Sequence, residues 1–408
     1  MLRLLLLITS MADERYVFLL AITFALVYLK MSNAQNFVEL TSQHGYQSEQ
    51  HTVTTEDGYI LTMFRIDKAK NCNATKRSPS VLLMHGLLLS SDAWIDAGPK
   101  AGLAYLLSDE CYDLWVGNCR GNYYSRAHTS LDPDNESAFW DFDTFEIGMY
   151  DNPAMIDYIL NLTGSNRLNY IGFSQGSGTL LIMCSERPEY CGKIQLMIAL
   201  APASRMANTK SAVFRALTSL FAKHKNKFTE HRLTGVLSPG GPVQKIAHFF
   251  CRTKIFGPIC DLGIQVGDHV NGLHLGSISH ETIKILFKHF PAGTSVKNMA
   301  WYGQAIDSQT LTKFDYGKKK NLIKYGSETP SAYNISAVTA PVMCLYGKND
   351  GIVDSDDVKW LLSELPNVVE AIEVEEPRWT HFDCKLFVCL LFDTHNYILA
   401  PNDSNRWR

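Results

Sequence analysis

A serine flanked by glycines is the residue of this chain best suited to do chemistry. Ser174 stands in residues 168–180 (Leu-Asn-Tyr-Ile-Gly-Phe-Ser-Gln-Gly-Ser-Gly-Thr-Leu), where a short apolar run ends at Gly172 and a helix-compatible run begins at Thr179. Strand, sharp turn and helix are the context that a G-x-S-x-G nucleophile elbow requires. Gly172 and Gly176 suit a strained turn that leaves no room for a Cβ. The pattern predicts an accessible serine nucleophile beside the amino end of a helix.

The five-residue pattern alone also fits an ordinary glycine turn that carries a surface serine. The apolar runs on either side of Ser174 favour the elbow. A serine nucleophile further needs a base, and the base needs a carboxylate that orients it. In hydrolases built around such an elbow, these partners follow in the chain order Ser, then Asp or Glu, then His.

Both partners occur in that order, each on a loop after an apolar strand candidate. Asp350 belongs to the loop Gly-Lys-Asn-Asp-Gly that follows residues 340–346, and His381 comes after residues 368–374. A histidine on that loop can reach across the top edge of the sheet to Ser174. We therefore predict that Asp350 orients His381 and that His381 acts as the base.

Other acidic and histidine side chains near these positions fit structural roles better. Asp354, Asp356 and Asp357 come at the expected start of a helix, where carboxylates cap the first turn and complement the helix dipole. His395 lies beyond the last apolar segment. None of these four residues is expected to take part in the chemistry.

The oxyanion formed during acyl transfer needs two hydrogen-bond donors. Residues 80–89 form a buried strand candidate that reaches His85 and Gly86. One donor in this kind of site is an N–H of the loop after that strand, and the other is the N–H after the nucleophile. Leu87 and Gln175 are the predicted donors through their backbone amides, while His85 is expected to support the loop.

The apolar segments predict an α/β fold with a mostly parallel central sheet. Continuous apolar runs suit strands that are covered on both faces, and helical patterns over residues 149–160 and 179–185 intervene. Residues 51–66 instead predict a β-hairpin that turns at Asp57-Gly58. The parallel strands are expected near residues 80–86, 112–118, 168–173, 194–201, 340–346 and 368–375.

The regular succession of apolar strand candidates is interrupted between about residue 204 and residue 334. Amphipathic runs such as 211–222 and 243–250 take its place. We interpret this insertion as a helical cap and lid whose apolar faces form an acyl-binding cleft; the alternative is that those faces only pack on the core. The expected organisation is a targeting segment (1–34), a first part of the core (35–203), the cap and lid (204–334) and a second part of the core (335–408).

Between about residues 40 and 400, the chain resembles the acid lipases typified by gastric lipase and lysosomal acid lipase, including their lipase 3-like insect relatives. Several blocks together carry this resemblance. They are residues 55–62 (Thr-Glu-Asp-Gly-Tyr-Ile-Leu-Thr), 84–88 (Met-His-Gly-Leu-Leu), 112–128 (Tyr-Asp-Leu-Trp-Val-Gly-Asn-Cys-Arg-Gly-Asn-Tyr-Tyr-Ser-Arg-Ala-His), 139–142 (Phe-Trp-Asp-Phe), 146–151 (Glu-Ile-Gly-Met-Tyr-Asp), 291–298 (Pro-Ala-Gly-Thr-Ser-Val-Lys-Asn) and 346–350 (Tyr-Gly-Lys-Asn-Asp).

The resemblance implies an α/β-hydrolase fold and a serine hydrolase that cleaves triacylglycerols or cholesteryl esters at a lipid–water interface. It implies the same triad and the same oxyanion donors that the residues themselves predict. It also implies a disulfide between Cys251 and Cys260 in the cap. Vertebrate members carry His where this chain has Phe173, a departure that concerns substrate or pH preference rather than the proton transfers.

Composition fits a large soluble enzyme of one main domain, and the expected reaction needs no cofactor or metal. The 408 residues are 46% hydrophobic, and the formal net charge of −3 excludes a strongly basic surface for nucleic acid. No metal-ligand spacing and no phosphate-cradling glycine loop stand out, and no obligate protein partner is evident. Two alternatives to a lipase remain: an esterase for small soluble esters, and a lipid-binding protein on the same scaffold.

The amino terminus predicts entry into the secretory route. Residues 17–29 are almost wholly apolar, Arg15 precedes them, and Ser32-Asn33-Ala34 forms a small-residue cleavage pattern. The expected destination is extracellular; the alternatives are the lysosome, or a membrane anchor if the segment is not cleaved.

The ten cysteines and five glycosylation sequons agree with such a destination. Four cysteines that lie in apolar segments are expected to be buried thiols: Cys184, Cys344, Cys384 and Cys389. The sequons are at Asn73, Asn135, Asn161, Asn334 and Asn402.

Overall fold

The computed structural model describes residues 36–66, 72, 79–237, 241–253, 256–275 and 277–386. The expected targeting segment therefore lies outside the described residues. The same holds for Cys389 and for the sequons at Asn73 and Asn402.

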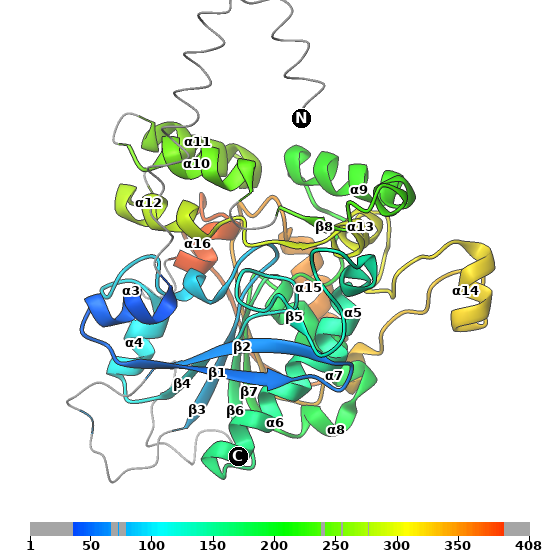
Figure 1. Ribbon diagram of the computed structural model, residues 1–408, viewed down its shortest axis with the longest axis horizontal. Helices are drawn as coiled ribbons and strands as arrows, with labels where there is room; N and C mark the ends of the chain where they lie inside the picture. Colours follow the sequence, from blue (N-terminus) through cyan, green and yellow to red (C-terminus); the bar gives the residue numbers. More distant parts are fainter. Residues whose placement is uncertain are drawn as a thin grey trace, which may run out of the picture. The chain divides into compact units, whose positions relative to one another are not determined.

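One twisted sheet forms the centre of the described part of the chain (Figure 1). Its strands run in the order β1-β2-β4-β3-β6-β7-β10-β11, with β5 paired to β2. All neighbours from β4 to β11 are parallel, whereas β1, β2 and β5 pair in antiparallel fashion. The strands are β1 (Ser48–Thr54), β2 (Tyr59–Ile66), β3 (Ser80–Met84), β4 (Asp113–Val116), β5 (Ala127–His128), β6 (Leu168–Phe173), β7 (Ile194–Leu200), β10 (Val342–Tyr346) and β11 (Val368–Glu373). The six predicted parallel strands and the predicted hairpin are confirmed.

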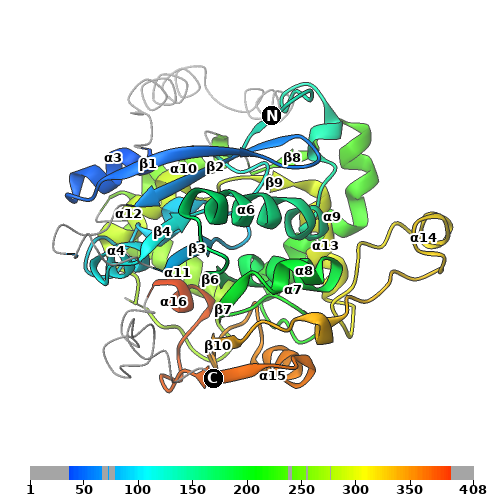
Figure 2. The same cartoon turned by 90° about the horizontal axis from the view of Figure 1, so that it is seen from below.

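Helices cover both faces of this sheet. Successive strand residues alternate between two hydrophobic clusters, so that Leu82 and Met84 face one and Val81 and Leu83 the other. The first cluster includes side chains of α6 (Asn152–Thr163), α7 (Gln175–Glu186), α8 (Pro188–Cys191) and α15 (Ser355–Glu364); the second includes side chains of α3 (Phe37–Gln43), α4 (Leu103–Asp109) and α16 (His381–Leu386). Figure 2 shows α6, α7 and α8 together on one side of the sheet.

The helix predicted over residues 149–160 begins differently in the structure. A π-helical turn over Ile147–Asp151 leads into α6, which ends at Thr163. Pro153 has no N–H to give to the carbonyl of Met149, which accepts a hydrogen bond from Arg187 Nη1 (3.3 Å) instead. The proline thus accounts for the widened turn at the start of the helix.

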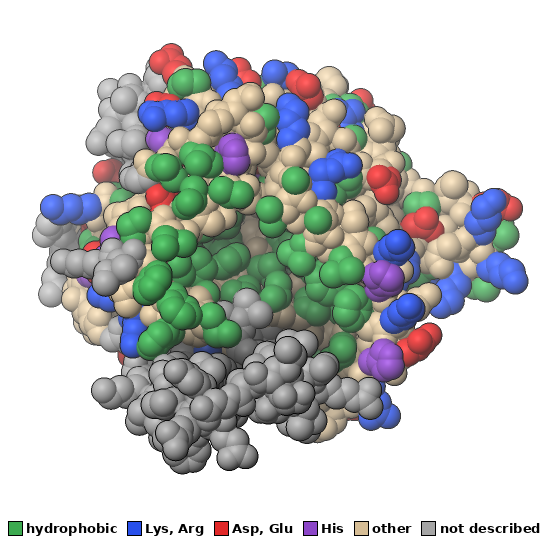
Figure 3. All heavy atoms as spheres, turned by 90° about the horizontal axis from the view of Figure 1, so that it is seen from above, with side chains coloured by type: hydrophobic (Ala, Val, Ile, Leu, Met, Phe, Trp, Pro, Cys, Tyr) green, Lys and Arg blue, Asp and Glu red, His purple; other side chains and the backbone are tan. Residues whose placement is uncertain are grey.

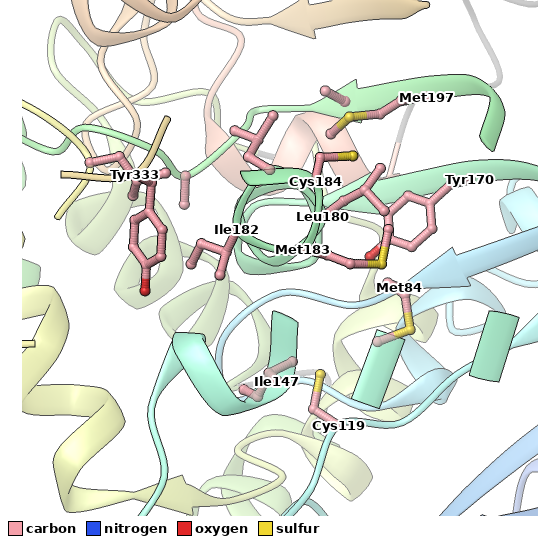
Figure 4. Packing of buried hydrophobic residues seen from close by; sticks show 14 of the residues in the cluster. Met84, Cys119, Ile147, Tyr170, Leu180, Ile182, Met183, Cys184, Met197 and Tyr333 are labelled. Carbon is pink, nitrogen blue, oxygen red and sulfur yellow. The ribbon is translucent and has the colours of Figure 1, made fainter. Parts of the chain in front are cut away.

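The helix after the elbow is buried on all sides. Ten consecutive residues from Gln175 to Cys184 are buried in α7. In Figure 4, Leu180 and Met183 lie beside Tyr170 of β6, while Ile182 points the opposite way, toward Tyr333. A helix that is packed all round cannot shift without opening the core, so this packing fixes the position of the elbow.

The segment between β7 and β10 is mainly helical; in Figure 1, α9 to α13 lie above the sheet and α14 lies to its side. It contains α9 (Ala212–Glu230), β8 (Gly235–Val236), α10 (Pro242–Cys251), α11 (Gly257–Asp268), α12 (His280–His289), β9 (Thr294–Ser295), α13 (Val296–Ala305) and α14 (Lys318–Tyr325). We refer to residues 204–334 as the cap; this boundary stays a prediction. Among the described residues, no helix is both long and apolar enough to cross a membrane.

Three disulfides join described cysteines. They are Cys72–Cys111, Cys184–Cys191 and Cys251–Cys260. The prediction that Cys184 is a free thiol is wrong, because the short turn from α7 into α8 brings Cys191 back against it. Cys344 and Cys384 are buried and free, as predicted.

Candidate active site

Ser174 occupies a strained turn between β6 and α7, and it is buried in this structure rather than accessible as predicted. Its backbone has φ 52° and ψ −114°, a conformation that costs a non-glycine residue energy. A Cβ on Gly176 would overlap the carbonyl of Met84, and one on Gly172 would lie 2.5 Å from the backbone N of Ser177. The predicted need for glycine at both positions is confirmed. The carbonyl of Leu200 in β7 accepts the N–H of Ser174 (2.9 Å), which anchors the turn to the sheet.

Asp350 and His381 are brought together beyond the carboxyl ends of β10 and β11. The Nδ1 of His381 lies 2.7 Å from Oδ2 of Asp350. The other carboxylate oxygen accepts the backbone N–H groups of Ile352 (2.9 Å) and Val353 (2.7 Å). Both side chains are buried, and these contacts leave the carboxylate little freedom to turn.

The local charges make His381 more basic than an ordinary histidine. Burial by itself would lower the pKa of His381, but the negative charge of Asp350, its hydrogen bond and the charge of Asp268 together raise it. The ring of Phe173 packs on the imidazole, with ring centroids 4.8 Å apart. The residue that departs from the vertebrate pattern is therefore in direct contact with the candidate base.

The loop after β3 carries the first candidate oxyanion donor. Among the described residues, the N–H of Leu87 has no hydrogen-bond acceptor. His85 supports this loop: its Nδ1 donates to the Gly86 carbonyl (2.8 Å), and its Nε2 accepts the N–H of Cys119 (3.1 Å). Burial lowers the pKa of His85 to about 4, so this histidine stays neutral and structural.

Gln175 supplies the second candidate donor from the first position of α7, where helix geometry provides no partner for the N–H. Its side chain is held by the cap. Gln175 Oε1 accepts a hydrogen bond from Asn298 Nδ2 (2.8 Å) and lies 3.3 Å from the hydroxyl of Tyr302, both on α13. The block over residues 291–298 thus touches the elbow directly, a contact that its sequence did not reveal.

Two further polar residues near the candidate triad were missed by sequence reasoning. Asp268, the last residue of α11, accepts the backbone N–H groups of His381 (3.0 Å) and Phe382 (2.9 Å). Asn349 Oδ1 accepts the N–H groups of Val270 (3.0 Å) and Asn271 (2.5 Å). No local pattern marks Asp268, because its partners lie more than a hundred positions away in the chain.

The remaining predicted residues take structural or surface positions. Asp354 caps α15 by accepting the N–H of Asp356 (3.0 Å), as predicted. Asp357 is buried against Arg205, whose Nε donates to it at 2.7 Å. The sequon residues that the structure describes, Asn135, Asn161 and Asn334, are all exposed. No cluster of three or more metal-ligating side chains occurs in the described part of the chain.

The outer face of the cap is rich in exposed apolar side chains. Figure 3 shows such side chains gathered around a hollow on this face. Ile259 is the most exposed of them on α11, at 59%. We call the following set the apolar cap face: Val213, Leu217 and Leu220 on α9, Ile246 and Phe250 on α10, and Ile259, Leu262 and Val266 on α11.

Comparison with known proteins gives matches over most of the chain. A model of a partial α/β-hydrolase lipase region matches residues 37–98, and a model of the α/β-hydrolase fold matches residues 79–234. Lipase 1 of Drosophila melanogaster is 38% identical over 87% of this chain and 76% of its own length. Lipase 3 of the same fly is 37% identical, over 85% and 87% of the two chains. Gastric triacylglycerol lipase of Bos taurus is 35% identical over 86% of each chain.

Proposed function

Because this chain belongs to the acid lipase family of α/β-hydrolases, we propose that it cleaves carboxylic esters of neutral lipids. Triacylglycerols and cholesteryl esters are the proposed substrates. The observation that carries the proposal is the pairing of His381 with Asp350 in an α/β-hydrolase sheet that presents Ser174 on a strained elbow.

The first half of the proposed reaction forms an acyl-enzyme. Ser174 Oγ attacks the ester carbonyl carbon while His381 Nε2 takes the hydroxyl proton, and Asp350 stabilises the resulting imidazolium. The carbonyl oxygen becomes an oxyanion that the N–H groups of Leu87 and Gln175 receive. Removing one such donor costs roughly 3–4 kcal/mol of transition-state stabilisation in comparable sites. Collapse of the intermediate then expels the alcohol, which takes its proton from His381.

Water completes the cycle by the same route. His381 removes a proton from the water as its oxygen attacks the acyl carbon, and a second oxyanion forms in the same place. Release of the fatty acid returns the proton from His381 to Ser174. Every proton passes through one imidazole, so the scheme needs no cofactor or metal.

The apolar cap face supports a substrate presented at a lipid–water interface. Exposed apolar patches of this kind mark sites that bind other surfaces or ligands. Binding through this face would place the hollow in Figure 3 against the lipid. For the location of the enzyme we keep secretion as the proposal, with the lysosome or a membrane anchor as alternatives.

Labelling with a fluorophosphonate probe, combined with assays on two substrates, tests the proposal. The wild-type protein should be labelled at Ser174 and should release fatty acid from emulsified long-chain triacylglycerol. Ser174→Ala should lower kcat by about 10⁶-fold while the protein stays folded. Ser185→Ala, at the far end of the same helix, serves as the matched control.

Other outcomes would change the assignment. Labelling together with hydrolysis of monomeric esters alone would favour an esterase. A folded protein that is not labelled, even after detergent treatment, would favour a lipid-binding protein. Ester hydrolysis retained by Ser174→Ala would overturn the triad.

A further inference from the structure

A short stretch of the cap is attached to both loops that carry the candidate aspartate and histidine. The carbonyl of Asp268 accepts the N–H of Gly351 (2.7 Å), and His269 forms an antiparallel bridge with Asp350. The side chain of Asn349 binds the same stretch. Its Oδ1 accepts the N–H of Val270 (3.0 Å), and its Nδ2 donates to the carbonyl of Gly272 (2.9 Å). The cap therefore meets the loop of Asp350 through its backbone and through one buried amide.

The carboxylate of Asp268 accepts hydrogen bonds from the backbone at His381. One oxygen accepts the N–H of His381 and the other accepts the N–H of Phe382. These are the first two N–H groups of α16, which have no partner within the helix. Asp268 is 1% exposed, so it is a buried acceptor at the start of this helix, and the two N–H groups that it accepts stabilise its ionised form against the cost of burial.

We propose that Asp268, through this backbone contact and its charge, is a positioning residue for the catalytic histidine, contributed by the cap. The inference rests on the proposed function of Ser174, Asp350 and His381. The carboxylate fixes the backbone from which the imidazole projects, and its negative charge favours the imidazolium that forms in each half-reaction. The cap thereby supplies a part of the catalytic machinery as well as a surface.

The charged and titratable groups around His381 come from three elements. Asp350 follows β10, Asp268 ends α11, and Asp383 and the thiol of Cys384 belong to α16 itself. Asp383 is paired with His274 of the cap through Nδ1 (2.9 Å). Burial and the charge of Asp350 raise the pKa of Asp268, and Asp268 in turn helps to raise the pKa of His381.

The test compares Asp268→Asn with the wild-type protein in kcat, KM and the pH profile of kcat/KM. The carboxamide offers one acceptor and no charge, so one N–H of α16 loses its partner. We expect kcat to fall about 100-fold and KM to change by less than about twofold. The acid limb of kcat/KM should move to lower pH, since the loss of negative charge lowers the pKa of His381.

Asp357→Asn is the matched control. Asp357 is equally buried, lies in the first turn of α15 and accepts the backbone N–H of Asn208 (2.8 Å). It touches neither the elbow nor the triad. This variant should lose stability but keep kcat and the position of the acid limb.

The outcomes separate the inference from the proposed function. A wild-type protein that the fluorophosphonate does not label overturns both. A labelled wild type with an Asp268→Asn variant of unchanged kcat overturns the inference alone, as does a lower kcat with an unmoved acid limb.

If Asp268→Asn does not fold, Asp268→Glu takes its place, because it keeps the charge and displaces the carboxylate by one methylene. It should lower kcat and leave the acid limb in place, and an unchanged kcat would overturn the inference.

Discussion

The core and the cap use apolar side chains in opposite ways. In the core, α7 buries ten consecutive residues and the strands on both sides of β6 are covered. In the cap, α10 and α11 leave large apolar side chains such as Phe250 and Ile259 in solvent. Apolar surface that is kept exposed is available to a partner outside the chain. The contrast teaches that buried apolar packing is concentrated in the core and that exposed apolar surface is concentrated in the cap.

The cap nevertheless reaches the loops of Asp350 and His381 through polar contacts on its inner side. Asp268 and Asn349 join α11 and the residues after it to the loops of the candidate triad, and Asn298 holds Gln175. Polar contacts of this kind define geometry more strictly than apolar packing does, because hydrogen bonds depend on direction. The inner side of the cap thus aligns residues, while its outer side offers surface.

Among the changes that compare core and cap, the largest effect on stability is expected from a methyl group added to the elbow, by Gly176→Ala. The new Cβ would overlap the backbone of β3 at Met84, which cannot move without opening the sheet. We expect a loss of at least about 4 kcal/mol in the free energy of unfolding, together with loss of probe labelling at Ser174. Denaturant unfolding measures the first and mass-mapped labelling the second. A variant of wild-type stability would show that the core is less rigid than its packing indicates.

A smaller and more selective effect is expected from polar substitutions on the apolar cap face. The double variant Ile259→Ser and Leu262→Ser removes two exposed side chains of α11 without touching the core. We expect KM for emulsified triacylglycerol to rise at least about 10-fold, since a tenfold change corresponds to about 1.4 kcal/mol and full burial of a single such side chain contributes on the order of 1.5–3 kcal/mol. Hydrolysis of a short, monomeric ester should stay unchanged.

The control for this variant is Ile323→Ser on α14. Ile323 is 85% exposed, yet α14 lies apart from α10 and α11 in Figures 1 and 2. It should leave both activities unaltered. Equal loss on emulsified and monomeric substrates in the double variant would mean that the apolar cap face shapes the site rather than binding the interface.

The same contrast explains what the sequence could predict. The strands, the hairpin at Asp57-Gly58 and the glycines around Ser174 were predictable because burial and tight turns leave local patterns. The need for a histidine and a carboxylate followed from the chemistry of a serine nucleophile, and the chain order that pointed to Asp350 and His381 followed from the fold to which such an elbow belongs. These features depend on neighbours in the sequence or on strand ends that share one edge of the sheet.

The contacts between the cap and the core could not be predicted from local sequence patterns. Asp268 lies 113 positions from His381, and Asn298 lies 123 positions from Gln175, so that no periodicity connects them. Cys184 looked like a buried thiol because its apolar neighbours said nothing about the turn that returns Cys191. Long-range polar pairs are fixed by tertiary packing, and their sequence signal is a single residue in an otherwise ordinary helix.

The smallest expected effect comes from the counterpart of the elbow variant, Gly263→Ala in α11. No atom lies within 4 Å of the position that the new Cβ would take, and the residue is helical and exposed. Alanine in place of glycine should therefore stabilise the helix by about 0.5–1 kcal/mol, whereas the same change at Gly176 destroys the elbow. A thermal unfolding scan measures this gain, and activity on emulsified substrate should stay the same if α11 works as a rigid helix. Loss of activity without loss of stability would instead show that α11 must bend for lipid to enter, which would make flexibility, as well as apolar surface, a property that separates the cap from the core.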